Sequence, residues 1–143
     1  MAPDSPFPVL RQVVLDTEDA RGLAEFYRSL LGYAYRPGDE PPADGAADAR
    51  GGDWLVLRNP SGGVALAFEQ VPGLRRSTWP DDEIPQQLHL DLTVGSVADL
   101  DRQHRRALEL GATLLLDRSD DEEEPLRVYA DPAGHPFCIF VAA

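Results

Sequence analysis

The chain has 143 residues, 43% of them hydrophobic, and its 25 acidic residues against 13 basic ones give a formal net charge of −12. This size and composition fit one ordinary domain with a real core, and the negative charge excludes nucleic acid and anionic membranes as expected partners. A single cysteine, Cys138, excludes an intramolecular disulfide, and Met1–Pro8 has no signal-peptide pattern, so we expect a cytoplasmic protein.

An amphipathic helix is the clearest element of the first half. It follows an alternating strand over residues 10–16, and from Leu23 onward apolar residues recur at the spacing of a helix with one buried face. Thr17 or Asp19 is suited to cap its start, and Gly32 to end it.

The rest of the first half predicts strands around a loop that has no hydrophobic period. Residues 37–52 are rich in Pro, Gly, Ala and Asp, which is typical of a mobile loop. The expected strands are 33–36, 54–58 and 64–71. The order is therefore strand, helix, strand, strand, strand.

The second half opens on the stretch Leu88–Leu92, which alternates strictly and so predicts a strand with two different faces. His89 and Asp91 share one face, and the leucines share the other. Before it, residues 72–86 form a linker around Trp79, which we expect to clamp the linker against a sheet, with a lid over a cavity as the alternative.

A second helix follows, with Ser96 as its cap and Gly111 as its end. The last strands are expected at 113–116, 126–130 and 136–141. The five acidic residues at 120–124 lack the spacing of a cation-binding loop and predict a solvated loop.

Two landmarks recur in the same order in both halves. Leu30-Leu31-Gly32 matches Glu109-Leu110-Gly111, and Asn59-Pro60-Ser61-Gly62 matches Asp131-Pro132-Ala133-Gly134. Such a repeat favours duplication of one βαβββ module. The modules are 10–71 and 87–142, joined by the linker 72–86.

With these motifs the chain resembles the vicinal oxygen chelate superfamily, the group of glyoxalases, bleomycin resistance proteins and dioxygenases. The resemblance extends over nearly the whole chain, and it also includes Val13-Val14-Leu15-Asp16, Phe26-Tyr27 and His89-Leu90-Asp91-Leu92. It implies an α+β fold, in which residues 1–143 form a single glyoxalase-like domain. Two tandem βαβββ modules would make a cupped, mainly antiparallel mixed sheet with the helices on the outer face. The resemblance also implies a homodimer.

The resemblance further implies four metal-ligand positions, two with His and two with Glu or a similar ligand in metal-dependent members. In this chain they fall on Gln12, Ala67, His89 and Cys138, and only His89 matches. We therefore expect no resident metal or other cofactor. If a divalent metal is bound, His89, Cys138 and Gln12 are its expected ligands, because imidazole and thiolate suit zinc.

Alternation along the strands places seven candidate ligand-binding residues in the cup. They are Gln12, Trp54, Ala67, His89, Asp91, Cys138 and Phe140. The repeat points Arg127 and Tyr129 away from the cup, although alternation alone allows the reverse. A mainly apolar wall with a few converging polar groups is typical of a small-molecule site.

The sequence therefore predicts a small-molecule-binding protein of the glyoxalase and bleomycin resistance type with a degenerate metal site. The acidic surface fits solubility, and it would also attract a cationic compound. The alternative is a metal-dependent lyase, isomerase or dioxygenase that uses His89 and Cys138. A metal-independent lyase or dioxygenase of glyoxalase type would use His89 as general base beside Asp91, with which it is expected to share a face but no orienting hydrogen bond.

Overall fold

The first helix, α1 (Ala20–Leu31), has the ends that the sequence predicts. In the computed structural model, which describes residues 6–142, the Asp19 side chain accepts a hydrogen bond from the Gly22 amide at the start of α1. Gly32 ends the helix in the left-handed region, at φ 70°, where a residue with a Cβ is disfavoured. The N-terminal prediction concerned Met1–Pro8, and its residues 1–5 lie outside the described range.

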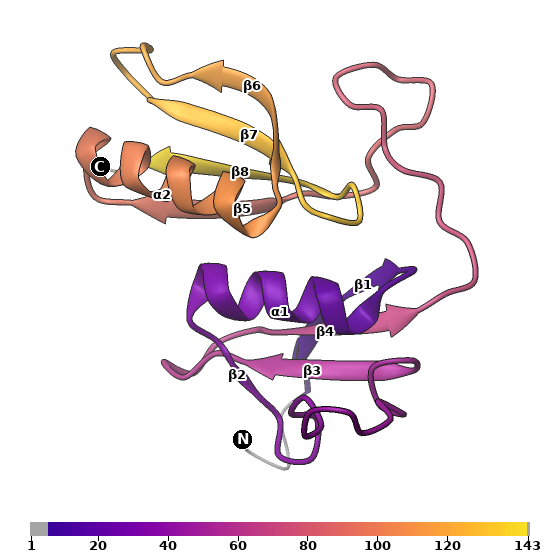
Figure 1. Cartoon of the computed structure of the whole chain (residues 1–143). Coiled ribbons are helices and arrows are strands. Elements are labelled where there is room, and N and C mark those ends of the chain that lie inside the picture. The colour runs from indigo at the N-terminus through magenta and orange to yellow at the C-terminus, as the bar shows by residue number, and fades with distance from the viewer. Residues whose placement is uncertain (1–5, 143) are drawn as a thin grey trace.

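The first module forms a four-stranded mixed sheet, here the N-terminal sheet (Figure 1). Its strands are β1 (Gln12–Thr17), β2 (Ala34–Tyr35), β3 (Trp54–Arg58) and β4 (Ala65–Gln70), in the order β1-β4-β3-β2. Strand β1 runs parallel to β4, and the other neighbours are antiparallel. This leaves one side of β1 unpaired at the sheet edge.

The second module repeats this topology as the C-terminal sheet. Its elements are β5 (Leu90–Val94), α2 (Val97–Leu110), β6 (Thr113–Arg118), β7 (Leu126–Ala130) and β8 (Pro136–Val141), with strand order β5-β8-β7-β6. The Ser96 side chain caps α2 by accepting from the Asp99 amide. The predicted α+β fold of two βαβββ modules is confirmed.

One hydrophobic core joins the two modules, because both helices pack on the faces that the two sheets turn toward each other (Figure 1). The ring centroids of Phe26 on α1 and Phe137 on β8 lie 5.9 Å apart. Two polar contacts span the same junction: the Tyr27 hydroxyl donates to Asp131 at 2.7 Å, and Arg106 donates to the Ser29 carbonyl at 2.6 Å. The opposite face of each sheet therefore points away from the shared core.

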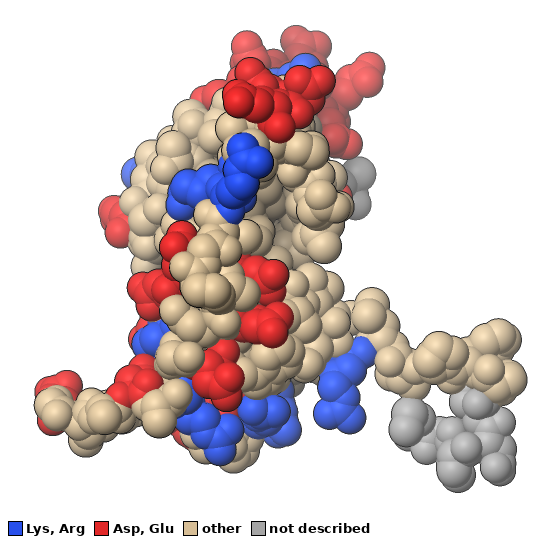
Figure 2. Space-filling view, turned by 90° about the vertical axis from the view of Figure 1, so that its right-hand side faces the viewer, with Lys and Arg blue, Asp and Glu red and all other residues tan. Residues whose placement is uncertain are grey.

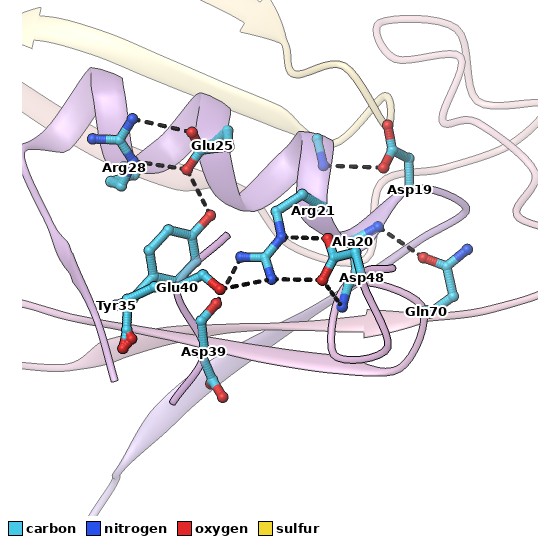
Figure 3. Close-up of polar contacts among 12 residues, drawn as sticks. Asp19, Ala20, Arg21, Glu25, Arg28, Tyr35, Asp39, Glu40, Asp48 and Gln70 are labelled. Atoms are coloured by element: carbon cyan, nitrogen blue, oxygen red, sulfur yellow. Dashed lines mark hydrogen bonds and ion pairs between the residues drawn. The ribbon is translucent and has the colours of Figure 1, made fainter. Parts of the chain in front are cut away.

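The loop 37–52, for which the sequence predicts mobility, is anchored to α1 and β3 by several side-chain contacts. Arg21 on α1 holds the Asp48 carboxylate through two hydrogen bonds and donates to the Asp39 and Glu40 carbonyls (Figure 3). The Asp39 side chain is completely buried, accepts from the Val56 amide, and pairs with Arg36 and Arg50. The amino-acid composition gave no sign of these contacts.

The start of β5 also differs from the prediction. The strand begins at Leu90, so His89 precedes it, and Leu88 is 47% exposed whereas Leu90 and Leu92 are half-buried. Within the described residues, no helix is long and apolar enough to cross a lipid bilayer.

Candidate functional site

A hollow of about 450 Å³ lies on the free face of the C-terminal sheet, here the C-terminal hollow. Its apolar wall includes Trp79, Leu126, Val128 and Phe140, and its polar groups are Gln86, His89, Asp91, Arg118, Glu124 and Cys138. The size and the mixture of apolar wall and few polar groups are those of a small-molecule site. Four of the seven candidate residues, His89, Asp91, Cys138 and Phe140, are together here.

Strand register explains why these side chains meet. Asp91 on β5, Cys138 on β8 and Val128 on β7 are neighbours across the sheet, and alternation points all three to the same face. Leu126 on β7 and Phe140 on β8 are also paired, each two residues along its strand from Val128 and Cys138, so they point to the same face. The sequence alone indicates which side chains of one strand share a face. The pairing of β5, β8 and β7 then brings side chains from three strands into one hollow.

The orientation of Arg127 and Tyr129, which the sequence left open, is away from this hollow. Arg127 lies 3.1 Å from Asp101 on α2 and 3.3 Å from Asp117, and the buried Tyr129 hydroxyl is 2.8 Å from Nδ1 of His104. Burial raises the pKa of Tyr129 to about 12, so the phenol keeps its proton. His104 packs against the Tyr129 ring from α2.

Asp91 is the centre of the polar groups in the hollow. The Cys138 thiol donates to Oδ1 of Asp91 at 3.3 Å, and Nε2 of His89 lies 3.2 Å from the same oxygen. His89 and Asp91 therefore share a face, as expected, and their contact is one of ion-pair distance. Burial, with the hydrogen bond to Asp91, raises the pKa of Cys138 to about 12. The thiol is thus a neutral hydrogen-bond donor near pH 7.

The other three candidate residues lie on the free face of the N-terminal sheet. Ala67 is buried beside Val56 and Ala65, Trp54 packs against this patch, and Gln12 pairs with Ala65 along β1. Because the helices separate the two sheets, one chain does not bring these residues to the C-terminal hollow.

A second hollow, of about 330 Å³, lies between β1, the linker and the β7–β8 turn. It contains Asp16 and Glu69, neighbours in the β1–β4 register. The hydrogen bond that protonated Glu69 donates to Asp16 and the repulsion between the two carboxylates raise the pKa of Glu69. His135, in the β7–β8 turn, contacts the Asp16 carbonyl at 2.7 Å, so it ties the two modules together at this point.

Eight of the twelve residues that line the C-terminal hollow are not among the predicted site residues, and two of them come from the linker. Trp79 and Gln86 both come from the linker, which lies between β4 and β5. For Trp79 the sequence offered a position over a cavity as the alternative to clamping the linker against a sheet. For Gln86 the sequence offered no signal, because a glutamine in a loop is ordinarily solvated.

Acidic side chains form a dense group at the upper end of the face shown in Figure 2. Smaller acidic groups and arginines lie over the middle and lower parts of the same face. The acidic run 120–124 forms the loop between β6 and β7, and its last residue, Glu124, lines the C-terminal hollow. Negative charge therefore lies at the edge of the hollow.

Each module forms one four-stranded sheet through the same βαβββ connection, and each sheet has a helix on one face. The fold therefore consists of two similar modules. A scan against protein families matches residues 12–140 to the glyoxalase-like domain. The chain belongs to this family, and its fold is that of the vicinal oxygen chelate superfamily.

Solved structures agree with the fold. A glyoxalase/bleomycin resistance protein/dioxygenase family enzyme from Burkholderia phytofirmans PsJN is similar with a TM-score of 0.69 at 17% identity, over 95% of this chain and 100% of that one. The fosfomycin resistance protein FosX from Listeria monocytogenes is similar with a TM-score of 0.67 at 14% identity, over 96% of this chain and 94% of that one. A glyoxalase/dioxygenase from Nostoc punctiforme is similar with a TM-score of 0.64 at 20% identity, over 100% of this chain and 96% of that one. The comparison with curated proteins finds no match.

Proposed function

We propose that this protein binds a small molecule in the C-terminal hollow, without a resident catalytic metal. The observation that supports this most directly is the arrangement around Asp91, where a protonated thiol and an imidazole share one carboxylate oxygen beside an apolar wall. These groups can donate and accept hydrogen bonds to a ligand. The fold is that of the glyoxalase-like family, and two solved structures of similar fold carry the words bleomycin resistance protein in their names.

The residues at the four expected ligand positions do not fit a divalent metal. Ala67 has no donor atom, and Gln12 has only an amide oxygen. The raised pKa of Cys138 opposes the thiolate that a metal requires. Among residues 6–142, no group of three or more His, Cys, Asp or Glu side chains is arranged to hold a metal ion. We therefore assign no step to a metal.

The test is a thermal-shift screen with small aromatic and cationic compounds. A true ligand at a concentration 100 times its Kd stabilises the native state by about 2.7 kcal/mol and raises Tm accordingly. The shift should be lost in Phe140→Ala, which removes a ring from the hollow, and kept in Leu108→Ala, which alters an exposed residue on α2. No shift across a broad library would count against the proposal.

A second candidate function is supported by the contact of 3.2 Å between His89 and Asp91. A carboxylate at this distance can orient an imidazole as general base, which suits a metal-independent lyase of glyoxalase type. In that case His89→Ala abolishes turnover of the substrate found and leaves its binding largely intact. The metal-dependent alternative, with His89 and Cys138 as ligands, predicts a rise in Tm on addition of zinc, nickel, manganese or iron.

We further propose that two copies of the chain pair to complete the binding cup. Strands β1 and β5 both have an unpaired edge, and an apolar groove of about 320 Å³ lies between them. Leu10, which lines this groove, is 70% exposed. Exposed apolar edges favour pairing with another chain. Such a pair can place Gln12, Trp54 and Ala67 of one copy opposite the C-terminal hollow of the other.

Light scattering after size-exclusion chromatography tests this pairing. The wild type should have the mass of a dimer, and Leu10→Arg should shift it to the 15.7 kDa monomer. Leu108→Arg introduces the same charge at an exposed leucine of α2 and should remain dimeric. A monomeric wild type at micromolar concentration would overturn the pairing and leave ligand binding by a single chain as the function.

A further inference from the structure

The linker between the two modules contributes two side chains to the C-terminal hollow. We propose that the Trp79 indole and the Gln86 amide oxygen select the ligand there, and that this ligand is a flat aromatic cation with N–H donors. This inference rests on the proposed binding function and extends it by naming the ligand class and the residues that recognise it.

Trp79 is held in place by the structure of the linker. The Thr78 amide donates to the Ile84 carbonyl at 2.8 Å, and the Ile84 amide donates to the Thr78 hydroxyl at 2.9 Å, which closes the turn after Trp79. The Trp79 amide donates to the Ser77 hydroxyl at 3.2 Å. Trp79 and Phe140 both line the hollow, so a flat ligand meets two aromatic rings. Aromatic faces attract cations as well as other rings.

Gln86 provides an unused hydrogen-bond acceptor. Its Oε1 is buried, and no group within the described residues 6–142 donates to it. Leaving a buried amide oxygen without a donor destabilises the native state, and such atoms in folded proteins need an explanation. Gln86 lines the C-terminal hollow, and a turn of its side chain toward the hollow would bring Oε1 within reach of a ligand N–H.

The charges of the hollow favour a cation over an anion. Two carboxylates, Asp91 and Glu124, and one guanidinium, Arg118, line it. Arg118 also lies close enough to Asp121 to lower the pKa of that carboxyl group, so part of its charge is compensated by the acidic loop. The acidic end of the molecule in Figure 2 adds negative potential. Because Gln86, Asp91 and Glu124 offer oxygen atoms that accept hydrogen bonds, we expect a ligand with N–H donors.

Three probes with the same ring test the ligand class: benzamidine, benzamide and benzoate. Isothermal titration should give a Kd for benzamidine at least about tenfold lower than for benzoate, with benzamide between them. Trp79→Ala should weaken benzamidine binding by about fivefold to tenfold. Leu108→Ala, which alters an exposed residue on α2 away from the hollow, is the control and should bind like the wild type.

Gln86→Leu separates a recognition role from a structural one. It should weaken benzamidine binding about tenfold and at the same time raise the Tm of the ligand-free protein, because an unsatisfied buried oxygen is removed. If Gln86 only supports the fold, Tm falls instead, and the assignment of Gln86 is overturned. Gln86→Glu keeps the acceptor and should bind benzamidine at least as tightly as the wild type.

The outcomes distinguish this inference from the proposed function. If Phe140→Ala loses benzamidine while both linker variants keep wild-type affinity, the hollow binds ligands and the linker assignment is wrong. If benzoate binds as tightly as benzamidine, or if only uncharged library compounds bind, the ligand class is wrong and the binding function stands. If neither the probes nor the library bind, the proposed function itself fails.

Discussion

At the scale of single residues, Asp91 determines the chemistry of the C-terminal hollow. Its Oδ1 contacts both His89 and Cys138, and the pKa of Cys138 rises to about 12 because the thiol is buried and because ionisation would place a thiolate beside the Asp91 carboxylate. Cysteine nucleophiles need the opposite environment, with a lowered pKa. Cys138 is accordingly suited to hydrogen bonding and not to covalent catalysis.

Alkylation of Cys138 by iodoacetamide measures this effect. We expect the wild type to react at pH 8 at least about tenfold more slowly than a free cysteine, because little thiolate is present. Asp91→Asn should lower the pKa of Cys138 and accelerate the reaction. Glu124→Gln should act in the same direction but less, since Glu124 contributes only through longer-range repulsion. A rate profile for the wild type that rises around pH 8 to 9 would contradict the assigned environment.

At the scale of elements, α1 organises the irregular part of the first module. Its Arg21 lies 5.1 Å from the centre of the Tyr35 ring and holds Asp48, at the far end of the loop 37–52 (Figure 3). The hydrogen bonds from Arg21 lower the pKa of Asp48 to about 2. The anchor is therefore complete above the ordinary carboxyl pKa of 3.8 and is lost as the pH falls toward about 2.

We expect Arg21→Gln to destabilise the protein by about 1–2 kcal/mol and to expose the loop to proteases, because several half-buried hydrogen bonds are lost. Urea unfolding and limited proteolysis measure the two effects. Arg28→Gln is the matched control on the same helix: its pair with Glu25 is more exposed and should contribute less than about 0.5 kcal/mol. Equal effects of the two substitutions would show that Arg21 is not a specific anchor.

At the scale of the whole molecule, the two modules are joined by their helices and by one buried hydrogen bond. Tyr27 on α1 donates to Asp131, which also accepts from the Ala133 and His135 amides in the β7–β8 turn. Burial raises the pKa of both Tyr27 and Asp131. The shared core and this bond connect residues that are 104 positions apart in the sequence.

Tyr27→Phe tests this junction by removing the donor and keeping the ring. The loss should cost about 1–3 kcal/mol, because a buried carboxylate oxygen is left without a partner. Tyr35→Phe removes a hydroxyl that donates to Glu25 at 2.7 Å near the surface, and it should cost less. Denaturant unfolding measures both. A Tyr27→Phe protein as stable as the wild type would show that this hydrogen bond adds little to the core and the other contacts that join the modules.

The sequence by itself determined the local structure of this protein. Strand alternation, the helical stripe and the caps at Asp19 and Ser96 are short-range properties, so the two helices and most strand boundaries could be predicted. The same alternation assigned the faces of Asp91, Cys138 and Phe140 correctly, because side chains on one strand must alternate.

Only the tertiary structure decided which of these faces meet. The helices pack between the sheets, so Gln12, Trp54 and Ala67 are separated within one chain from His89 and Cys138. The linker brings Trp79 and Gln86 to the C-terminal hollow, and Arg21 fixes a loop that looked mobile. The physical reason is the same in each case: these contacts join segments far apart in the chain, and no local pattern records which distant partner a side chain will meet.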